Sequence, residues 1–117
     1  MVEDPERVRT DQSIMFALTR YRNAYAALNA GAAKAVFPSV DERALARAFS
    51  GLRSQNLRFD VCQTRVLSAD QARVICKGSA TFITRVGNRE VRAVNREWSF
   101  LLHRRADEWT IASATTR

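Results

Sequence analysis

Two tyrosines on one predicted helix are the side chains best suited to meet a ligand. Tyr21 and Tyr25 are four residues apart, so both lie on one helix face, a single turn from each other. A buried phenol can pack in the core with its hydroxyl hydrogen-bonded, or the hydroxyl can contact a ligand or donate to a developing oxyanion. The spacing allows both roles, and core packing is the interpretation that it favours.

Three charged residues within predicted strands are further candidates. Asp60 or Glu97 could move a proton if its carboxylate lay in an apolar pocket, because burial raises a carboxyl pKa towards neutrality. On a long antiparallel sheet such charges are more often on the wet face or in cross-strand pairs. Arg96 is in phase with Trp98 and Phe100, so it could mark the polar end of an apolar surface and hold a carboxylate ligand bidentately.

The two cysteines flank a predicted turn at residues 68–71. If Leu67 lies opposite Gln71, Cys62 falls directly opposite Cys76, and a non-hydrogen-bonded pair would bring them close enough for a disulfide. A turn one residue longer or shorter would put them on opposite faces, and two buried free thiols are the alternative. These thiols and one distant histidine, His103, are too few ligands for a zinc site, so no metal is predicted.

The formal net charge of +7 comes almost wholly from arginine. Arginines are spread along the chain among acidic residues, which is typical of a solvated basic surface and makes nucleic-acid binding the weaker interpretation. The sequence has no glycine-rich phosphate loop, no Ser–His–Asp order and no metal-ligand cluster, so we predict no cofactor. The nearest approach to a basic patch consists of Arg85, Arg89, Arg92, Arg96, Arg104 and Arg105.

Three helical pieces are predicted in the first half, after a flexible tail over residues 1–10. An amphipathic helix spans residues 11–30, with Gly31 as its left-handed cap, and a short helix follows over residues 32–36. Ser39 and Glu42 have the spacing of a capping box, which predicts a third helix that ends near Gly51. Residues 11–117 are expected to form one domain.

From Leu57 the apolar period changes from about four to two, which predicts strands over residues 57–67, 72–86, 90–103 and 109–115. Gly87 and Asn88 suggest a tight hairpin, and Gly78 a bending point within its strand. Trp98 and Trp109 could stack across strands. Helices followed by a meander of long strands predict an α+β domain with a strongly curved, four-stranded antiparallel sheet.

This order of motifs resembles the nuclear transport factor 2-like superfamily, the cone-shaped fold of ketosteroid isomerase, scytalone dehydratase and polyketide cyclases. The resemblance rests on the segments 21–29, 36–41, 96–100 and 108–111 and extends over nearly all of the chain after residue 10. It implies a two-layer cone, a homodimer formed through the outer sheet face, and acid–base groups inside the cone where a member is an enzyme. The catalytic residues of those enzymes find no matching set here.

We therefore interpret the chain as a dimeric, non-catalytic module whose cone binds a small apolar or carboxylate-bearing molecule, or whose sheet face binds a partner. The alternatives are a lyase or isomerase, with Asp60, Glu97 and Tyr21 as its catalytic candidates, and weak nucleic-acid binding through surface arginines. Membrane insertion is not expected; a free-standing chain would be cytoplasmic, and a disulfide or a membrane-protein tail extracytoplasmic. The predicted pocket residues are Tyr21, Tyr25, Phe37, Phe49, Phe82, Arg96 and Trp98.

Overall fold

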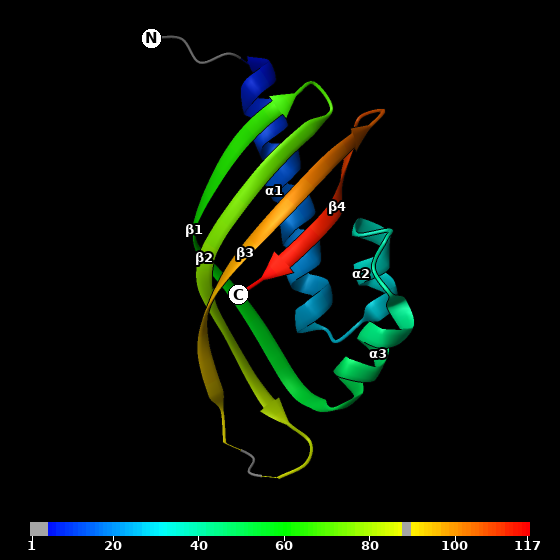
Figure 1. The fold of residues 1–117 in the computed structure, drawn as a ribbon, viewed down its shortest axis with the longest axis vertical. Coiled ribbons are helices and arrows are strands. Elements are labelled where there is room, and N and C mark those ends of the chain that lie inside the picture. The colour runs from blue at the N-terminus through cyan, green and yellow to red at the C-terminus, as the bar shows by residue number, and fades with distance from the viewer. Residues whose placement is uncertain (1–4, 88–89) are drawn as a thin grey trace.

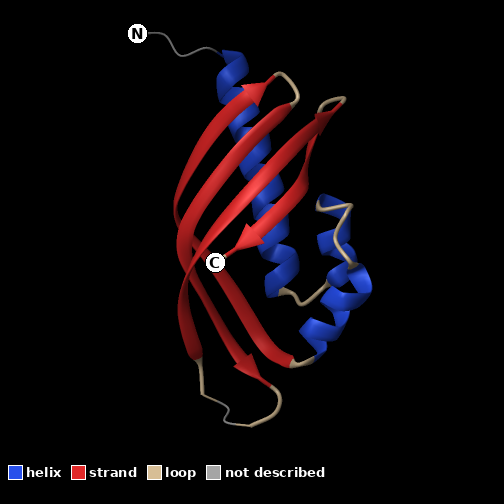
Figure 2. Cartoon of the chain, in the orientation of Figure 1, coloured by secondary structure: helices blue, strands red, loops and turns tan. Residues whose placement is uncertain are grey.

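The computed structural model describes residues 5–87 and 90–117. The strands form one antiparallel sheet in the order β1-β2-β3-β4, which curves around α1, while α2 and α3 lie beside the C-terminal end of α1 (Figure 1, Figure 2). The predicted α+β class and four-stranded sheet are confirmed. The elements are α1 (Pro5–Ala26), α2 (Ala30–Val36), α3 (Glu42–Ser50), β1 (Leu52–Ser68), β2 (Gln71–Thr84), β3 (Arg92–Arg105) and β4 (Glu108–Thr116).

Helix α1 begins and ends earlier than predicted. It begins at Pro5, so residues 5–10 are helical where a tail was expected; proline is favourable in the first turn, where its missing N–H has no intrahelical partner. After Ala26 the chain turns at Leu28, which has a φ of 53°. The amides of Leu28 and Asn29 bond back to the carbonyls of Tyr25 and Ala24, which closes the helix. The predicted glycine cap is therefore wrong.

Asparagine and aspartate cap the two short helices. Gly31 lies inside α2, whose N-cap is Asn29, and Asp41 caps α3 by accepting a hydrogen bond from the Ala44 amide at 3.0 Å. The predicted capping box at Ser39 is wrong, because α3 begins later and its first amides meet the Asp41 carboxylate. The Ser39 hydroxyl instead donates to the Ala112 carbonyl at 3.1 Å, which ties the connection between α2 and α3 to β4.

A bulge bends the sheet in the middle of β1. The pairing of β1 with β2 shifts between Phe59 and Val61, which leaves Asp60 as the extra residue, and Gly78 lies opposite on β2. A Cβ atom at Gly78 would overlap the carbonyl oxygen of Arg58, so only glycine allows β1 to approach this closely. The predicted bending point at Gly78 thus coincides with an irregularity in the neighbouring strand.

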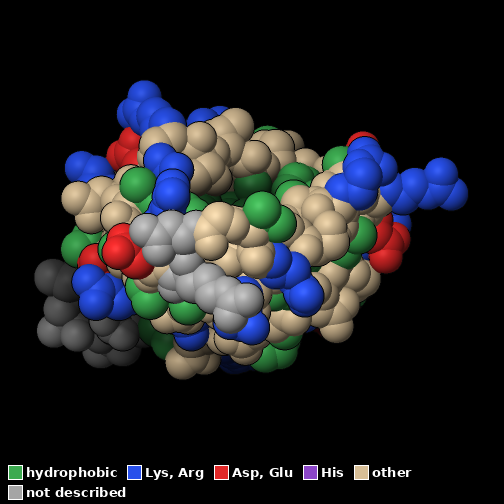
Figure 3. Space-filling view, turned by 90° about the horizontal axis from the view of Figure 1, so that it is seen from below, with side chains coloured by type: hydrophobic (Ala, Val, Ile, Leu, Met, Phe, Trp, Pro, Cys, Tyr) green, Lys and Arg blue, Asp and Glu red, His purple; other side chains and the backbone are tan. Residues whose placement is uncertain are grey.

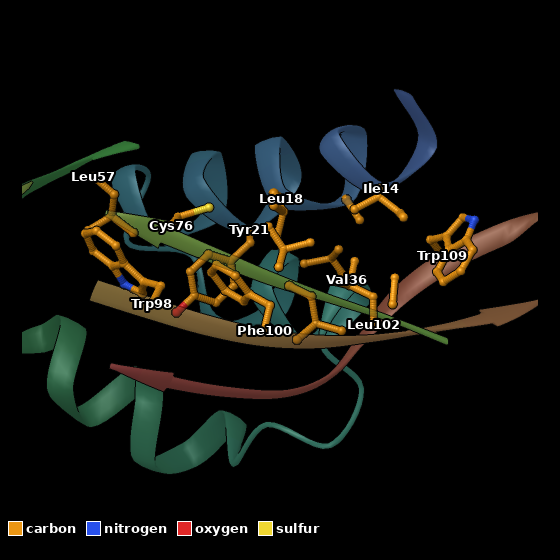
Figure 4. Close-up of a cluster of buried hydrophobic side chains, with 14 of the residues drawn as sticks. Ile14, Leu18, Tyr21, Val36, Leu57, Cys76, Trp98, Phe100, Leu102 and Trp109 are labelled. Atoms are coloured by element: carbon orange, nitrogen blue, oxygen red, sulfur yellow. The ribbon is translucent and has the colours of Figure 1, made fainter. Parts of the chain in front are cut away.

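Two predictions concern the contacts between strands. Strand β2 ends at Thr84 and β3 begins at Arg92, each two residues short of its predicted bound, and the tight hairpin proposed at Gly87 and Asn88 falls between them. Asn88 itself lies outside the described residues. Trp98 pairs with Thr116 and Trp109 with Arg104, which puts the two indoles at opposite ends of the core and prevents their stacking (Figure 4).

The core occupies one half of the space between α1 and the sheet. We call this the closed half; here α1 and α2 cover the inner face of the sheet, and β4 extends the sheet beyond β3. Strand β4 pairs with β3 as far as Trp98, and Arg117 extends this pairing to Glu97. Among the described residues, β3 has no neighbour on that side from Arg96 to Arg92. We call this the open half. The closed half contains the largest fully buried side chains, among them Ile14, Leu18, Val36, Val74, Phe100, Leu102 and Ile111 (Figure 4).

Candidate functional site

A chain of six aromatic rings runs along the inside of the cone, from the closed half into the open half. Helix α1 contributes two of them, α3 one, β1 one and β3 two. Neighbouring ring centroids lie between 4.2 and 5.9 Å apart, mostly in edge-to-face geometry, which is the arrangement that aromatic quadrupoles favour. In order of contact the rings are Phe49, Tyr25, Tyr21, Phe100, Phe59 and Trp98.

Side chains fill the inner end of the cone, and its mouth is the accessible part. Tyr21 and Trp98 are each 3% exposed and Phe100 is completely buried, so they act as core residues. The rings of Tyr25 and Phe59 are half-buried and pack against this core. Seen from the open end, hydrophobic side chains lie in a recess behind the foremost atoms, with Lys and Arg side chains around it (Figure 3).

The predicted pocket residues divide between these two regions. Phe49 is buried at 6% exposure and contacts the ring of Tyr25 at 5.2 Å between centroids. Phe37 is half-buried against the core, and Phe82, which pairs with Gln55 and Arg92, is half-buried at the mouth. The chain thus brings most of the predicted residues together, but only some of them could contact a ligand.

The two tyrosine hydroxyls form a neutral, hydrogen-bonded pair. Burial, repulsion from Tyr25 and a hydrogen bond donated to Tyr25 all raise the pKa of Tyr21. Burial also raises the pKa of Tyr25, partly offset by the hydrogen bond that it accepts from Tyr21. Both phenols therefore keep their protons at neutral pH, and Tyr25 can donate its own proton to an acceptor at the mouth of the cone.

Arg96 stands where β4 ends, at the boundary between the two halves. Arg96 is two residues from Trp98 along β3 and pairs with Gly78, so it is assigned to the same inner face of the sheet as Trp98, as predicted. The side chain is exposed, and within residues 5–87 and 90–117 it has no hydrogen bond or ion pair. An unpaired guanidinium beside an aromatic surface can bind an anionic ligand.

The two carboxylate candidates lie away from the tyrosines. Glu97 alternates with Trp98, so it lies on the outer face, where its carboxylate is 2.8 Å from Nε of Arg117. Asp60, the bulge residue, is exposed and lies 2.8 Å from Nε of Arg58. Both border an open groove of about 660 Å³ on the outer face, together with Val61, Lys77, Gly78, Asn95, Arg96 and Arg117.

Structure comparison identifies the fold. Neither a protein-family model nor a curated protein sequence matches this chain. A hexachlorocyclohexane dehydrochlorinase of Novosphingobium barchaimii superposes with a TM-score of 0.81 at 10% identity, over 98% of this chain and 90% of that one. A nuclear transport factor 2-like protein of Salmonella enterica gives 0.80 at 12% identity, over 97% and 92%. A candidate scytalone dehydratase of Novosphingobium aromaticivorans also gives 0.80 at 12% identity, over 95% and 85%.

The chain has the nuclear transport factor 2-like fold. At these identities the likeness concerns the path of the backbone and carries no residue roles with it. The neighbours include proteins named as enzymes, so the fold by itself does not decide between catalysis and binding. That decision depends on the side chains inside this particular cone.

A disulfide joins β1 to β2 on the inner face of the nuclear transport factor 2-like cone. Cys62 lies opposite Cys76, as predicted, with their Cα atoms 4.1 Å apart. The predicted pair of Leu67 with Gln71 is wrong, because Ser68 pairs with Gln71 and the register shifts between Val66 and Ser68. Of the two alternatives considered, a disulfide and two free thiols, the structure contains the disulfide. The bond lies next to the bulge at Asp60 and beside Trp98, which pairs with Cys76 from the other side. It fixes β1, an edge strand, at the boundary between the closed and open halves.

The arginines do not gather into one patch. Arg104 and Arg105 lie at the turn into β4, whereas Arg85 and Arg92 lie at the opposite end of β3. Arg89 lies outside the described residues. His103 is exposed. The part of the chain that the structure describes contains no group of three or more His, Cys, Asp or Glu side chains placed to hold a metal ion, and no helix long and apolar enough to cross a membrane.

Three residues of the site were not among the predicted pocket residues. Phe59 and Phe100 complete the chain of rings, and both were in phase with predicted inward positions, so strand period alone could have identified them. Gln55 donates a hydrogen bond from Nε2 to the Tyr25 carbonyl at 3.2 Å. It precedes the predicted start of its strand, so no sequence signal assigned it to the sheet.

Proposed function

We propose that this chain is a non-catalytic binding module that takes a small, flat, largely apolar molecule at the open mouth of its cone. One observation carries the proposal: the inner wall of the open half is aromatic and aliphatic, with hydrogen-bond donors at its edge and no carboxylate or histidine. From the strands, the described residues of that wall are Gln55, Leu57, Phe59, Ala80, Phe82, Arg92, Val94, Arg96 and Trp98.

Such a wall is suited to binding. Half-buried aromatic rings gain free energy when a ligand removes their remaining surface from water. Tyr25 and Gln55 supply hydrogen-bonding groups near the same surface, and a few polar groups in an apolar pocket fix the orientation of a ligand. The exposed part of Phe59 and Phe82 offers an area suited to one or two fused rings.

The enzymatic alternative, a lyase or isomerase, lacks a base in this position. General base catalysis needs a proton acceptor within hydrogen-bond reach of the substrate carbon. Asp60 and Glu97 are bonded to arginines on the outer face, and the phenols of Tyr21 and Tyr25 are held in the neutral form. A tyrosine donor without a facing base can bind an oxygen but cannot complete a proton transfer.

Binding can be tested with naphthalene carboxamide, an uncharged flat probe. Titration should change the fluorescence of Trp98, which contacts Phe59, and should saturate. Phe59→Ala should weaken binding by about tenfold, because the lost contact area corresponds to roughly 1.5 kcal/mol. Phe16→Ala is the matched control, since this ring lies on the solvent side of α1 at 64% exposure and should not affect binding.

Two results would count against the proposal. Absence of saturable binding, or equal loss of affinity in Phe59→Ala and Phe16→Ala, would remove the mouth of the cone as the site. Catalysed isomerisation of a β,γ-unsaturated ketone, lost in Asp60→Asn or Glu97→Gln, would overturn the non-catalytic part and favour the enzyme.

The outer face of the sheet is proposed to hold a second copy of the chain. Val61 and Ile75 are 59% and 38% exposed on this face, between the ion pairs of Asp60 and Glu97. Exposed apolar side chains at the middle of a sheet are suited to a two-fold interface. Light scattering should give the mass of a dimer, and Ile75→Arg should give that of a folded monomer; a monomeric parent chain would refute the interface.

A further inference from the structure

Arg96 is a charged residue at the edge of the open half, and the binding of a neutral molecule would not explain its presence there. Its side chain is exposed, its position in β3 assigns it to the same sheet face as Trp98, and the described residues offer it no partner. Arginines on sheets usually lie opposite an acid or on the wet face. Directly opposite Arg96 is Gly78, which has no side chain to meet it.

The carboxylates that border Arg96 are already engaged. Asp60 is paired with Arg58 and Glu97 with Arg117, each at 2.8 Å, and the Glu97 and Arg117 backbones also exchange two hydrogen bonds. Among the described residues, the strands contribute no acidic side chain to the inner wall of the open half. Arg92, four residues along the same face, adds a second positive charge opposite Phe82. The mouth therefore has a positive edge that the protein does not neutralise.

We propose that the ligand is an aromatic carboxylate, with its rings against Phe59 and Phe82 and its carboxylate paired with Arg96. The inference rests on the proposed binding function and names the chemical class of the ligand. A guanidinium presents two parallel N–H groups that match the two oxygens of a carboxylate, and a hydrophobic surface at its side strengthens this pairing by excluding water.

A phosphate ester fits this mouth less well. Phosphate sites generally combine several cationic side chains or the amides of a helix N-terminus around three oxygens. Here the two arginines of the inner face, Arg92 and Arg96, are four residues apart on β3, about 13 Å along the strand, which is too far to surround one phosphate group. A single planar anion on an apolar body is the better match.

The test compares naphthoate with naphthalene carboxamide, two probes of nearly equal shape that differ in charge. The chain should bind naphthoate at least about tenfold more tightly, which is typical of a charge-assisted pair. Arg96→Gln should abolish this preference by lowering the affinity for naphthoate to about that for the carboxamide. Arg73→Gln is the matched control: it removes one exposed charge from the outer face of β2 and should retain the preference. Added salt should weaken naphthoate binding to the parent chain but have little effect in Arg96→Gln.

The outcomes separate this inference from the function on which it rests. Equal affinity for the two probes in the parent chain, or a preference that survives Arg96→Gln, overturns the carboxylate assignment and leaves the binding module intact. Failure of both probes to bind the parent chain overturns both. A preference lost equally in Arg96→Gln and Arg73→Gln assigns it to net charge and also refutes the role of Arg96.

Discussion

The closed and open halves of this cone have similar inward side chains but differ in how completely those side chains are buried. In the closed half, Phe100 and Leu102 are completely buried beneath α1 and α2. In the open half, Phe59 and Phe82 occupy equivalent inward positions on their strands, yet both remain half-buried. The difference lies in the surrounding elements of the described chain, since β4 widens the sheet only alongside the closed half and α1 ends at Ala26.

This comparison shows how one sheet can supply both stability and a site. A ring contributes to stability in proportion to the area that the protein itself removes from water. A ring left half-exposed forgoes part of that stabilisation, and the remainder is available to a ligand. The aromatic chain from Phe49 to Trp98 joins the two regions, so a molecule bound at the mouth would rest on a rigid core.

The largest effect should come from truncating matched rings in the two halves. Phe100→Ala should lower the free energy of unfolding by about 3–5 kcal/mol, as is usual for a fully buried phenylalanine that leaves a cavity. Phe82→Ala should cost about 1–2 kcal/mol, because much of that ring already faces water. Urea unfolding, extrapolated linearly to water, measures both.

The same pair should behave in the opposite way towards a ligand. Phe82→Ala should weaken the binding of naphthalene carboxamide although it lowers stability much less than Phe100→Ala does. Equal losses of stability in the two variants would mean that the open half is as well covered as the closed half, and the distinction between them would have to be abandoned.

The fold was largely predictable because hydrophobic period changes sharply along this chain. The turn near residues 68–71 indicated that Cys62 and Cys76 pair, since turn length determines register. Two irregularities were not predicted: a shift between Val66 and Ser68 at the turn, and the bulge at Asp60, which puts Cys62 on the same face as Leu57. Helix ends were less predictable. Asp41 rather than Ser39 caps α3, because several residues in that segment could serve and tertiary contact of Ser39 with Ala112 decided between them.

The site was harder to predict than the fold. A strand pattern gives the face on which a side chain lies, but not how far the neighbouring strand extends. Trp98 and Phe82 both alternate inward, yet the end of β4 decides that one is core and the other forms the mouth. No residue in β1 predicts the bulge at Asp60; the one indication in the sequence is Gly78 in the opposite strand. Asp60 was therefore a catalytic candidate until the structure assigned it to the outer groove.

Breaking the disulfide should have a smaller effect on stability than truncating Phe100, and it should affect the open half more than the closed half. It closes a loop with a sequence separation of 14, and a loop of that length is expected to contribute about 3 kcal/mol to stability. Reduction by a dithiol should lower the unfolding midpoint accordingly. In the reduced chain, amide exchange should accelerate first in β1 near Leu57, because the disulfide attaches this edge strand to β2 beside the bulge. Amides near Leu102 should stay protected by α1 and α2.

A double variant, Cys62→Ala with Cys76→Ala, is the control: it should already have the lowered midpoint and should not respond to the dithiol. If exchange near Leu102 accelerated as much as exchange near Leu57, the two halves would unfold as one unit, and the open half could not be called the weaker part. If exchange near Leu102 stayed slow, reduction would loosen the part of β1 that contains Phe59 while the core persisted. Naphthalene carboxamide should then bind the reduced chain less tightly than the oxidised chain.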